Sequence, residues 1–226
     1  MANIQSPEKT EAIRKRILFS AAKLFLQKGV AATTFSEISS ATGLSRSKVL
    51  YEMKSKEEIL CELVSYVLEG QFQATAAFLK GKTDDKILFY AAETTLQLYM
   101  AESSENVREI YSVAYSMPNS SAIIQQTITG KLEEIFKEHL PNLETKDFYM
   151  LEIATGGIMR GFMTVPCNMW FTMDMKVRSF LECVFKLYDV EQEKINEAVE
   201  FVSRFDYKAI AENVINNMLT YLENKT

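Results

Sequence analysis

Residues 17–60 read ILFSAAKLFLQKGVAATTFSEISSATGLSRSKVLYEMKSKEEIL, and this segment carries the clearest structural signals of the chain. Apolar side chains recur there every three or four residues, which predicts amphipathic helices. Gly29 and Gly43 interrupt the pattern and are expected to end the first and second helices. Thr34 is followed three residues later by Glu37, the spacing of a capping box, so a short second helix is expected to begin there.

A third short helix is expected between Ser45, which can cap it, and about Met53. Two short helices separated by a Gly-Leu-Ser turn and supported by a longer helix have the geometry of a helix-turn-helix. Val49 and Met53 are expected to face the core, while Leu44 fills the turn. A helix of this diameter fits the major groove of DNA. Its outer surface is predicted to carry Arg46, Ser47, Lys48, Tyr51 and Glu52.

A second capping box, formed by Ser55 and Glu58, begins a longer helix that is expected to run to about Phe78. Helical periodicity continues along the rest of the chain, and no sustained alternation of apolar and polar residues indicates a strand. The expected fold class is therefore all-α. An N-terminal three-helix helix-turn-helix domain, residues 1–68, would be joined by this long helix to a C-terminal helical bundle, residues 69–226.

The composition excludes several classes of protein. The chain has 226 residues, 47% of them hydrophobic, with 8 Gly and 4 Pro, which favours a helical globular protein over a fibrous or linker-rich one. It has no run of about 18 uncharged apolar residues and so no expected membrane span, and its polar start lacks the apolar core of a signal peptide. Three cysteines without a CxxC spacing favour a reduced, cytoplasmic protein. His139 is the only histidine, so no metal, cofactor or enzymatic activity is expected.

Charge is distributed unevenly along the chain. Residues 1–60 carry ten basic and six acidic side chains, a net charge of +4, whereas the remaining residues carry −9. A basic module attached to an acidic one is typical of a protein that binds a polyanion. Differences of this size also arise by chance, so the charge supports a DNA-binding interpretation only together with the helix-turn-helix spacing.

The quoted stretch resembles the DNA-binding domain of the TetR family of bacterial transcriptional regulators. The resemblance rests on AAKLFLQKG in the first helix, the TT pair before the second, the ATGLS turn and the closing KSKEEIL. It implies a cytoplasmic homodimeric regulator, usually a repressor, that binds double-stranded operator DNA and releases it when a small ligand binds. The C-terminal bundle is then expected to serve both ligand binding and dimerisation.

By position, the resemblance also implies which residues contact DNA. Arg46, Ser47 and Lys48 match base-reading positions, and hydroxyl, phenol and ammonium groups nearby match phosphate contacts. Thr34 can equally serve only as a helix cap, and the basic residues can form an ordinary solvated face. The expected DNA-binding residues are Thr33, Thr34, Ser45, Arg46, Ser47, Lys48, Tyr51, Glu52 and Lys56.

Four residues, Ser47, Leu50, Glu52 and Met53, depart from the family pattern, and Leu50 and Glu52 bear most on DNA binding. Leu50 stands where tyrosine is common and lacks its phosphate-bonding hydroxyl, while Glu52 stands where histidine or asparagine is common. A carboxylate facing DNA would weaken binding unless it accepts from cytosine or pairs with Lys48 or Lys56. The alternative interpretation is therefore a TetR-like ligand-binding or interaction module whose DNA-reading head is weakened.

Methionines and aromatic residues are concentrated between residues 100 and 175, where they can line an adaptable apolar pocket or form an ordinary core. The resemblance implies a ligand pocket in this region, and the expected ligand is small and mainly apolar. The turn at residues 165–170 is the expected pocket wall. The expected pocket residues are Tyr99, Arg108, Tyr111, Tyr115, Met159, Met163 and Trp170.

A dimer interface is expected from two further features of the bundle. Small residues among bulky ones at 147–163 allow a close helix approach, and the last helix presents an apolar face. Two such helices from each subunit suit a four-helix interface, although both can equally pack within one chain. The expected interface residues are Ile153, Gly157, Arg160, Gly161, Val214, Met218 and Leu222.

Overall fold

The computed structural model describes residues 7–223, which form eleven α-helices. In chain order these are α1 (Pro7–Lys28), α2 (Phe35–Thr42), α3 (Arg46–Glu52), α4 (Lys56–Leu79), α5 (Lys86–Glu102), α6 (Glu105–Ala114), α7 (Pro118–Phe136), α8 (Thr145–Thr164), α9 (Met173–Leu187), α10 (Gln192–Val202) and α11 (Tyr207–Glu223). The only strand-like pairing in this range is an isolated bridge between Asn168 and Phe171. The expected all-α fold class is confirmed.

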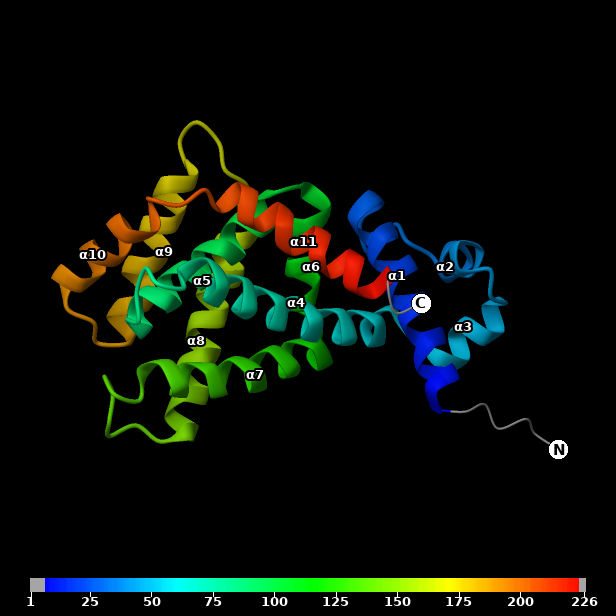
Figure 1. Ribbon diagram of the computed structural model, residues 1–226, viewed down its shortest axis with the longest axis horizontal. Coiled ribbons are helices and arrows are strands. Elements are labelled where there is room, and N and C mark those ends of the chain that lie inside the picture. The colour runs from blue at the N-terminus through cyan, green and yellow to red at the C-terminus, as the bar shows by residue number, and fades with distance from the viewer. Residues whose placement is uncertain (1–6, 224–226) are drawn as a thin grey trace.

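Helices α1 to α3 form one end of the molecule and enclose a small core (Figure 1). Phe25 from α1, Ile38 from α2 and Val49 from α3 are fully buried in it. Gly29 and Gly43 follow α1 and α2 with φ angles of 84° and 64°, a left-handed conformation that glycine adopts without a steric penalty. The chain can therefore turn sharply after each helix and fold back on the same core.

Helix α4 connects this end of the molecule to the bundle. Ser55 caps it by accepting a hydrogen bond from the Glu58 backbone N–H at 3.0 Å, and the helix ends at Leu79, one residue beyond the expected Phe78. Leu60, in its second turn, belongs to the core of α1 to α3, whereas Leu79 belongs to the core of the bundle. Because α4 is continuous across residue 68, the division into domains 1–68 and 69–226 remains our proposal.

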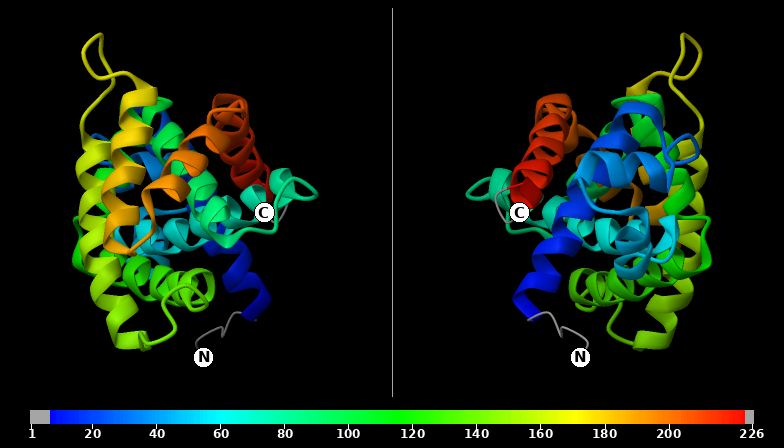
Figure 2. Two further views of the ribbon diagram at one scale, coloured as in Figure 1. Left: turned by 90° about the vertical axis from the view of Figure 1, so that its left-hand side faces the viewer. Right: turned by 90° about the vertical axis from the view of Figure 1, so that its right-hand side faces the viewer.

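Helix α5 is the centre of the bundle. Every residue from 90 to 98 is buried, because α4 and all helices from α6 to α11 pack around it. Helices α8 and α9 lie side by side at one face, and the loop between them projects from the body (Figure 2). Within residues 7–223, no helix combines the length and apolarity that crossing a bilayer requires.

Helix α11 runs back along the molecule toward the helix-turn-helix end (Figure 1). It packs against α1, α4 and α5. Leu222 near its end is fully buried in the core of α1 to α3, and the Tyr221 ring lies 5.6 Å from the Tyr66 ring of α4. The last helix therefore ties the bundle to the amino-terminal helices.

Candidate DNA-binding surface and ligand cavity

Hydrogen bonds at their first turns hold α2 and α3 in place. Thr34 Oγ1 accepts from the Glu37 backbone N–H at 3.3 Å, and Glu37 Oε2 accepts from the Thr34 N–H at 2.9 Å, which completes the expected capping box. At α3, Ser45 Oγ accepts from the Lys48 backbone N–H at 3.2 Å. Local contacts therefore specify where both helices begin and how α3 is presented.

The outward face of α3 is polar. Arg46 and Ser47 are exposed in its first turn, and Tyr51, one turn later, is 76% exposed. Lys48 Nζ lies 5.2 Å from the centre of the Tyr51 ring, a cation–π contact that orders both side chains. This face offers a guanidinium and a hydroxyl that can donate to base edges, and a phenol that can reach a phosphate.

Glu52 does not lie on this outward face, contrary to the expectation from the sequence. It is only 5% exposed, and its Oε1 lies 2.5 Å from Lys48 Nζ. Its backbone carbonyl accepts from the Arg14 guanidinium at 2.6 Å. Glu52 follows the buried Val49 by three residues, so both lie on the inner side of this short helix. The carboxylate is thus an internal partner of Lys48.

Two of the expected phosphate contacts are engaged inside the protein. Thr33 is buried, and its hydroxyl donates to the Gly29 carbonyl at 2.7 Å. The Lys56 ammonium donates to the carbonyls of Val30, Ala31 and Thr33 at 2.8, 3.3 and 3.1 Å. These groups stabilise the turn between α1 and α2, so a phosphate could use the Lys56 ammonium only by displacing its internal acceptors. Thr34 is exposed but occupied as the cap of α2.

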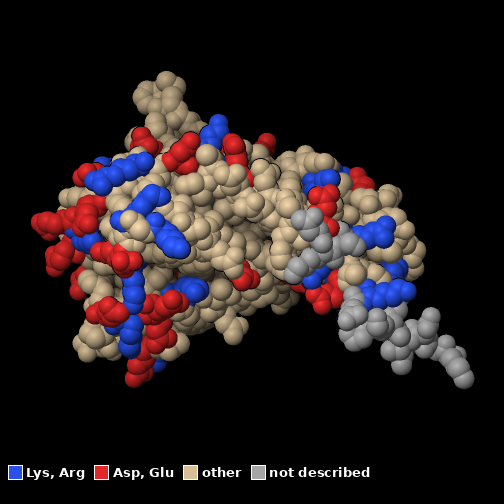
Figure 3. All heavy atoms as spheres, viewed as in Figure 1, with Lys and Arg blue, Asp and Glu red and all other residues tan. Residues whose placement is uncertain are grey.

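Arg16 is a candidate contact that the motif does not include. It is exposed on α1, and its Nη2 lies 3.3 Å from the position that a Cβ on Gly43 would take, beside the turn between α2 and α3. Figure 3 shows basic side chains around this end of the molecule, whereas the opposite end carries basic side chains together with most of the visible acidic ones. In the sequence, only the excess of basic residues in 1–60 indicates that Arg16 could contact DNA.

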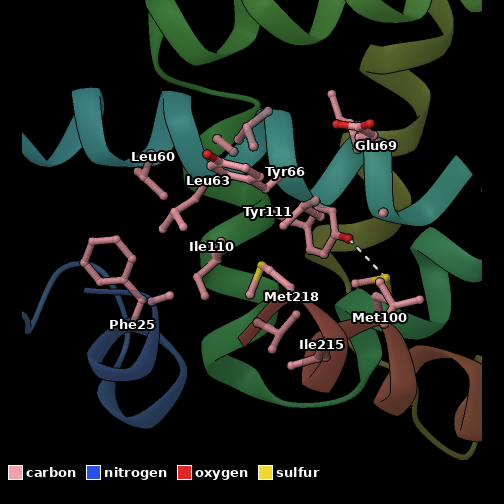
Figure 4. Close-up of a pocket in the computed structure, with 18 of the residues that line it drawn as sticks. Phe25, Leu60, Leu63, Tyr66, Glu69, Met100, Ile110, Tyr111, Ile215 and Met218 are labelled. Carbon is pink, nitrogen blue, oxygen red and sulfur yellow. Dashed lines mark hydrogen bonds between the residues drawn. The ribbon is translucent and has the colours of Figure 1, made fainter. Parts of the chain in front are cut away.

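A cavity of about 520 Å³ lies where the helix-turn-helix end meets the bundle. Helices α1, α4, α5, α6, α7 and α11 line it, and its walls are mainly apolar. Figure 4 labels ten of the lining residues: Phe25, Leu60, Leu63, Tyr66, Glu69, Met100, Ile110, Tyr111, Ile215 and Met218. Because α1 and α4 also belong to the helix-turn-helix end, a molecule in this cavity would touch both parts of the protein.

Tyr111 is the main polar group at the inner end of the cavity. Gln71 Nε2 donates to its hydroxyl, which in turn points to Met100 Sδ at 3.6 Å (Figure 4). Burial raises the pKa of Tyr111, so the phenol stays protonated in the physiological range. It can therefore orient a ligand by hydrogen bonding but cannot supply a charge.

The structure places the sequence-predicted pocket residues in different environments. Tyr111 and Tyr115 line the large cavity, and Met159 lines a smaller one described below. Tyr99, Arg108, Met163 and Trp170 line neither. Trp170 is 78% exposed, because the loop at 165–172 projects from the body, so this loop is not the expected pocket wall.

The missed cavity residues lie mainly on α4 and α11. From the helical periodicity, we expect the apolar residues of these helices to lie in the core. An apolar residue that packs in a core and one that lines a cavity give the same sequence pattern, however. Only the packing of α11 against α4 in the folded protein distinguishes a core residue from one that lines the cavity.

The predicted interface residues on α8 and α11 also differ. Ile153, Gly157, Arg160 and Gly161 are exposed along one side of α8. The residues on α11 are engaged within the chain, which corrects the expectation: Val214 is buried in the bundle core, Met218 lines the cavity and Leu222 is fully buried. Helix α9 instead has exposed apolar residues beside α8. We define the α8–α9 face by Tyr149, Met150, Ile153, Gly157, Gly161, Met175 and Leu187.

Comparisons with known proteins agree with this geometry. Residues 17–63 match the family model for bacterial regulatory proteins of the tetR family. The structure of RolR in complex with resorcinol has a TM-score of 0.68 at 18% identity, covering 87% of this chain and 96% of that one. RolR without ligand has a TM-score of 0.62 at 16% identity, covering 84% and 96%. No curated protein matches the chain. Residues 17–63 therefore match the DNA-binding domain of the tetR family of bacterial regulatory proteins, and the chain as a whole shares the fold of RolR.

Proposed function

We propose that this protein is a ligand-responsive cytoplasmic repressor of transcription that binds operator DNA as a homodimer. The observation that carries this proposal is the outward face of α3, where Arg46, Ser47 and Tyr51 are exposed on a helix whose start is capped. The exposed Arg16 beside the turn extends the basic surface. Such a surface combines phosphate contacts, which provide most of the affinity, with groups that can read bases.

A dimer follows from the need to read two half-sites, because one copy presents only one α3. The α8–α9 face supports this assembly, since it exposes Met150 at 59% and Ile153 at 49% next to glycines that permit close helix contact. Two helices from each copy would form a four-helix interface about a twofold axis. We propose this face as the dimer interface, in place of the α11 residues.

The ligand is proposed to bind in the large cavity and act through α6. Glu109 Oε1 accepts from the Ala31 backbone N–H at 2.8 Å, and Asn106 Nδ2 donates to the Leu26 carbonyl at 2.9 Å. These bonds fasten α6 to the end of α1. A ligand that prefers a displaced α6 would shift α1 and thereby the spacing of the two α3 helices, to an extent limited by its differential affinity for the two states.

The alternative function, a ligand-binding or interaction module with a weakened DNA-reading head, rested on Leu50 and Glu52. The ion pair of Glu52 with Lys48 keeps that carboxylate out of the proposed DNA surface. Leu50 remains as the departure that favours the alternative.

Fluorescence anisotropy with DNA flanking the gene for this protein tests the proposal. We expect binding to one fragment that weakens about a hundredfold or more between about 50 and 200 mM salt, because several phosphates are contacted. Arg46→Ala should weaken it at least about tenfold. Lys80→Ala, which removes an exposed cation at the far end of α4, is the matched control and should change little. Binding that is insensitive to salt, or equal on scrambled DNA, would support the alternative instead.

A further inference from the structure

A second, smaller pocket of about 30 Å³ lies deeper in the bundle, between α5, α7 and α8. Two carboxylates line it: Glu93 from α5 and Glu152 from α8, which are only 2% and 3% exposed. We call this space the carboxylate pocket and define it by Glu93, Gln97, Tyr115, Glu152 and Gly156. Tyr115 also lines the large cavity, so the two spaces share a wall.

The two carboxylates of this pocket receive few hydrogen bonds. Glu93 accepts from Gln97 Nε2 at 2.8 and 3.0 Å. The Thr155 side chain hydrogen-bonds to Glu152, and the Thr155 hydroxyl also donates to the Leu151 carbonyl at 2.9 Å. Within the described part of the chain, no lysine, arginine or histidine forms an ion pair with Glu93 or Glu152.

Lys131 is the cation that lines the pocket, and it is engaged elsewhere. Its Nζ lies 3.0 Å from Glu134 Oε2 and 5.4 Å from the centre of the Phe72 ring. Two buried carboxylates without a counter-charge are unfavourable when both are ionised. Burial accordingly raises the pKa of Glu93 to about 7, and burial together with the charge of Glu93 raises that of Glu152 to about 8.

The backbone leaves room beside these groups. A Cβ on Gly156 would lie 2.9 Å from Glu152 Oε1 and 3.8 Å from the Tyr115 ring, so the glycine keeps this part of the pocket open. A space of about 30 Å³ accommodates a small polar head group and not a whole organic ligand. A group that donates hydrogen bonds and carries positive charge would complement the two carboxylates in their ionised form.

We propose that the carboxylate pocket binds the primary ammonium group of an amphipathic amine, with Glu93 and Glu152 as its counter-charges and the apolar part of the ligand in the large cavity beyond Tyr115. This inference rests on the proposed ligand-responsive function and names the chemical class of the ligand. An ammonium offers three N–H donors to a site that is rich in acceptors. Its charge is stabilised strongly there, because the site is largely shielded from water.

Binding should be coupled to proton release. Both carboxyls must be ionised to hold the ammonium, so affinity rises with pH through the range in which they titrate. The other titratable groups that face them are Tyr90 from α5, Tyr111 from α6, Tyr115 after α6, Lys131 from α7 and Tyr188 after α9. Burial raises the pKa of all four tyrosines, so they stay neutral between about pH 6 and 9.

Calorimetric titration of the full chain tests this with phenylalkylamines carrying two to five methylene groups, each compared with the matching phenylalkyl alcohol. At pH 8.5 we expect at least one amine to bind tenfold or more tightly than its alcohol, with the preference shrinking at pH 6. In a Glu93→Gln, Glu152→Gln double variant the preference should disappear while alcohol binding persists. Gly156→Ala, whose Cβ would lie 2.9 Å from Glu152 Oε1 and crowd that carboxyl, should also reduce the preference.

The proposal is overturned if no amine in the series is preferred to its alcohol, or if the preference survives in the double variant. Circular dichroism verifies that each variant is folded, and removal of two buried charges is not expected to unfold the chain. The titration contains no DNA, so a failure to bind operator DNA would leave its result unchanged. An amine that binds here but does not release DNA would separate this site from the proposed regulation.

Discussion

Lys48 Nζ lies 2.5 Å from Glu52 Oε1, and this carboxylate is buried although α3 is the helix proposed to enter the major groove. Lys48 therefore has a structural task in addition to any contact with DNA. A loss of DNA binding on removal of Lys48 would combine both effects. Arg46, which is exposed in the first turn, is the cleaner test of base reading.

Replacement of Lys48 by alanine is expected to lower the free energy of unfolding by about 2 kcal/mol, because it leaves a buried carboxylate without its cation. The effect is below the maximum for a buried pair, since the Lys48 side chain is 27% exposed. Urea denaturation measures it. Addition of Glu52→Gln to the same chain should restore most of the loss, and a double variant no more stable than Lys48→Ala would contradict the pairing.

Replacement of Lys56 by methionine should destabilise the turn between α1 and α2. The variant keeps the aliphatic part of the side chain but leaves three carbonyl groups without their donor, a loss of about 1–3 kcal/mol. Thermal unfolding and amide exchange around residues 30–33 report it. Lys54→Met, at an exposed position two residues earlier, is the control and should stay within about 0.5 kcal/mol of the parent. Equal effects at both positions would refute the structural role of Lys56.

Acid should weaken the start of α2. The Lys28 ammonium and the Thr34 hydroxyl and backbone N–H lower the pKa of Glu37 from 4.5 to about 2. A carboxyl whose pKa is lower in the folded state stabilises that state above its unfolded pKa, and this contribution is lost as pH falls from about 4.5 to about 2. The protection factor of the Glu37 amide, which compares its exchange rate with that of an unstructured chain at the same pH, should fall over this range. In Glu37→Gln the titration should vanish, and an unchanged pH profile would disprove the assignment.

Glu93 and Glu152 should produce the opposite dependence. Their pKa values are raised in the folded protein from 4.5 to about 7 and 8, so the stability associated with the bound protons is present at low pH and lost as pH rises through those values. The ligand-free protein should therefore melt at a lower temperature at pH 8.5 than its Glu93→Gln, Glu152→Gln variant. At pH 5 the two should melt similarly. A parent chain that is more stable than the variant at pH 8.5 would contradict this.

Introduction of a charge at Ile153 should prevent dimerisation through the α8–α9 face. Ile153→Glu places a carboxylate in the middle of an apolar surface, which is costly to bury unpaired. Sedimentation velocity should show a dimer for the parent chain and a monomer for the variant. Tyr51→Glu changes an exposed aromatic residue at the opposite end of the molecule and should leave the dimer intact. A dimer that persists in Ile153→Glu would place the interface elsewhere.

The sequence alone predicts the parts of this protein that depend on neighbouring residues. Thr34 with Glu37, and Ser55 with Glu58, satisfy backbone donors within a single turn of helix, so their effect does not depend on the rest of the fold. The end of α2 at Gly43 can also be predicted from the sequence, because the left-handed conformation of a glycine is a local property. These signals sufficed to predict a helix-turn-helix and an all-α architecture.

Tertiary structure decided which side chains are available at the surface and where the cavities lie. Glu52 is turned inward by its pairing with Lys48 and by the approach of Arg14 from α1, and Lys56 is bound to carbonyls of an earlier turn. Leu222 of α11 is buried in the core of α1 to α3, which are far from it in the sequence. Contacts between residues distant in sequence leave no periodic signal, because helical periodicity records only that a side is apolar and not what covers it. The helix caps can therefore be predicted from the sequence. Which residues cover each apolar helix face depends instead on how the helices pack together.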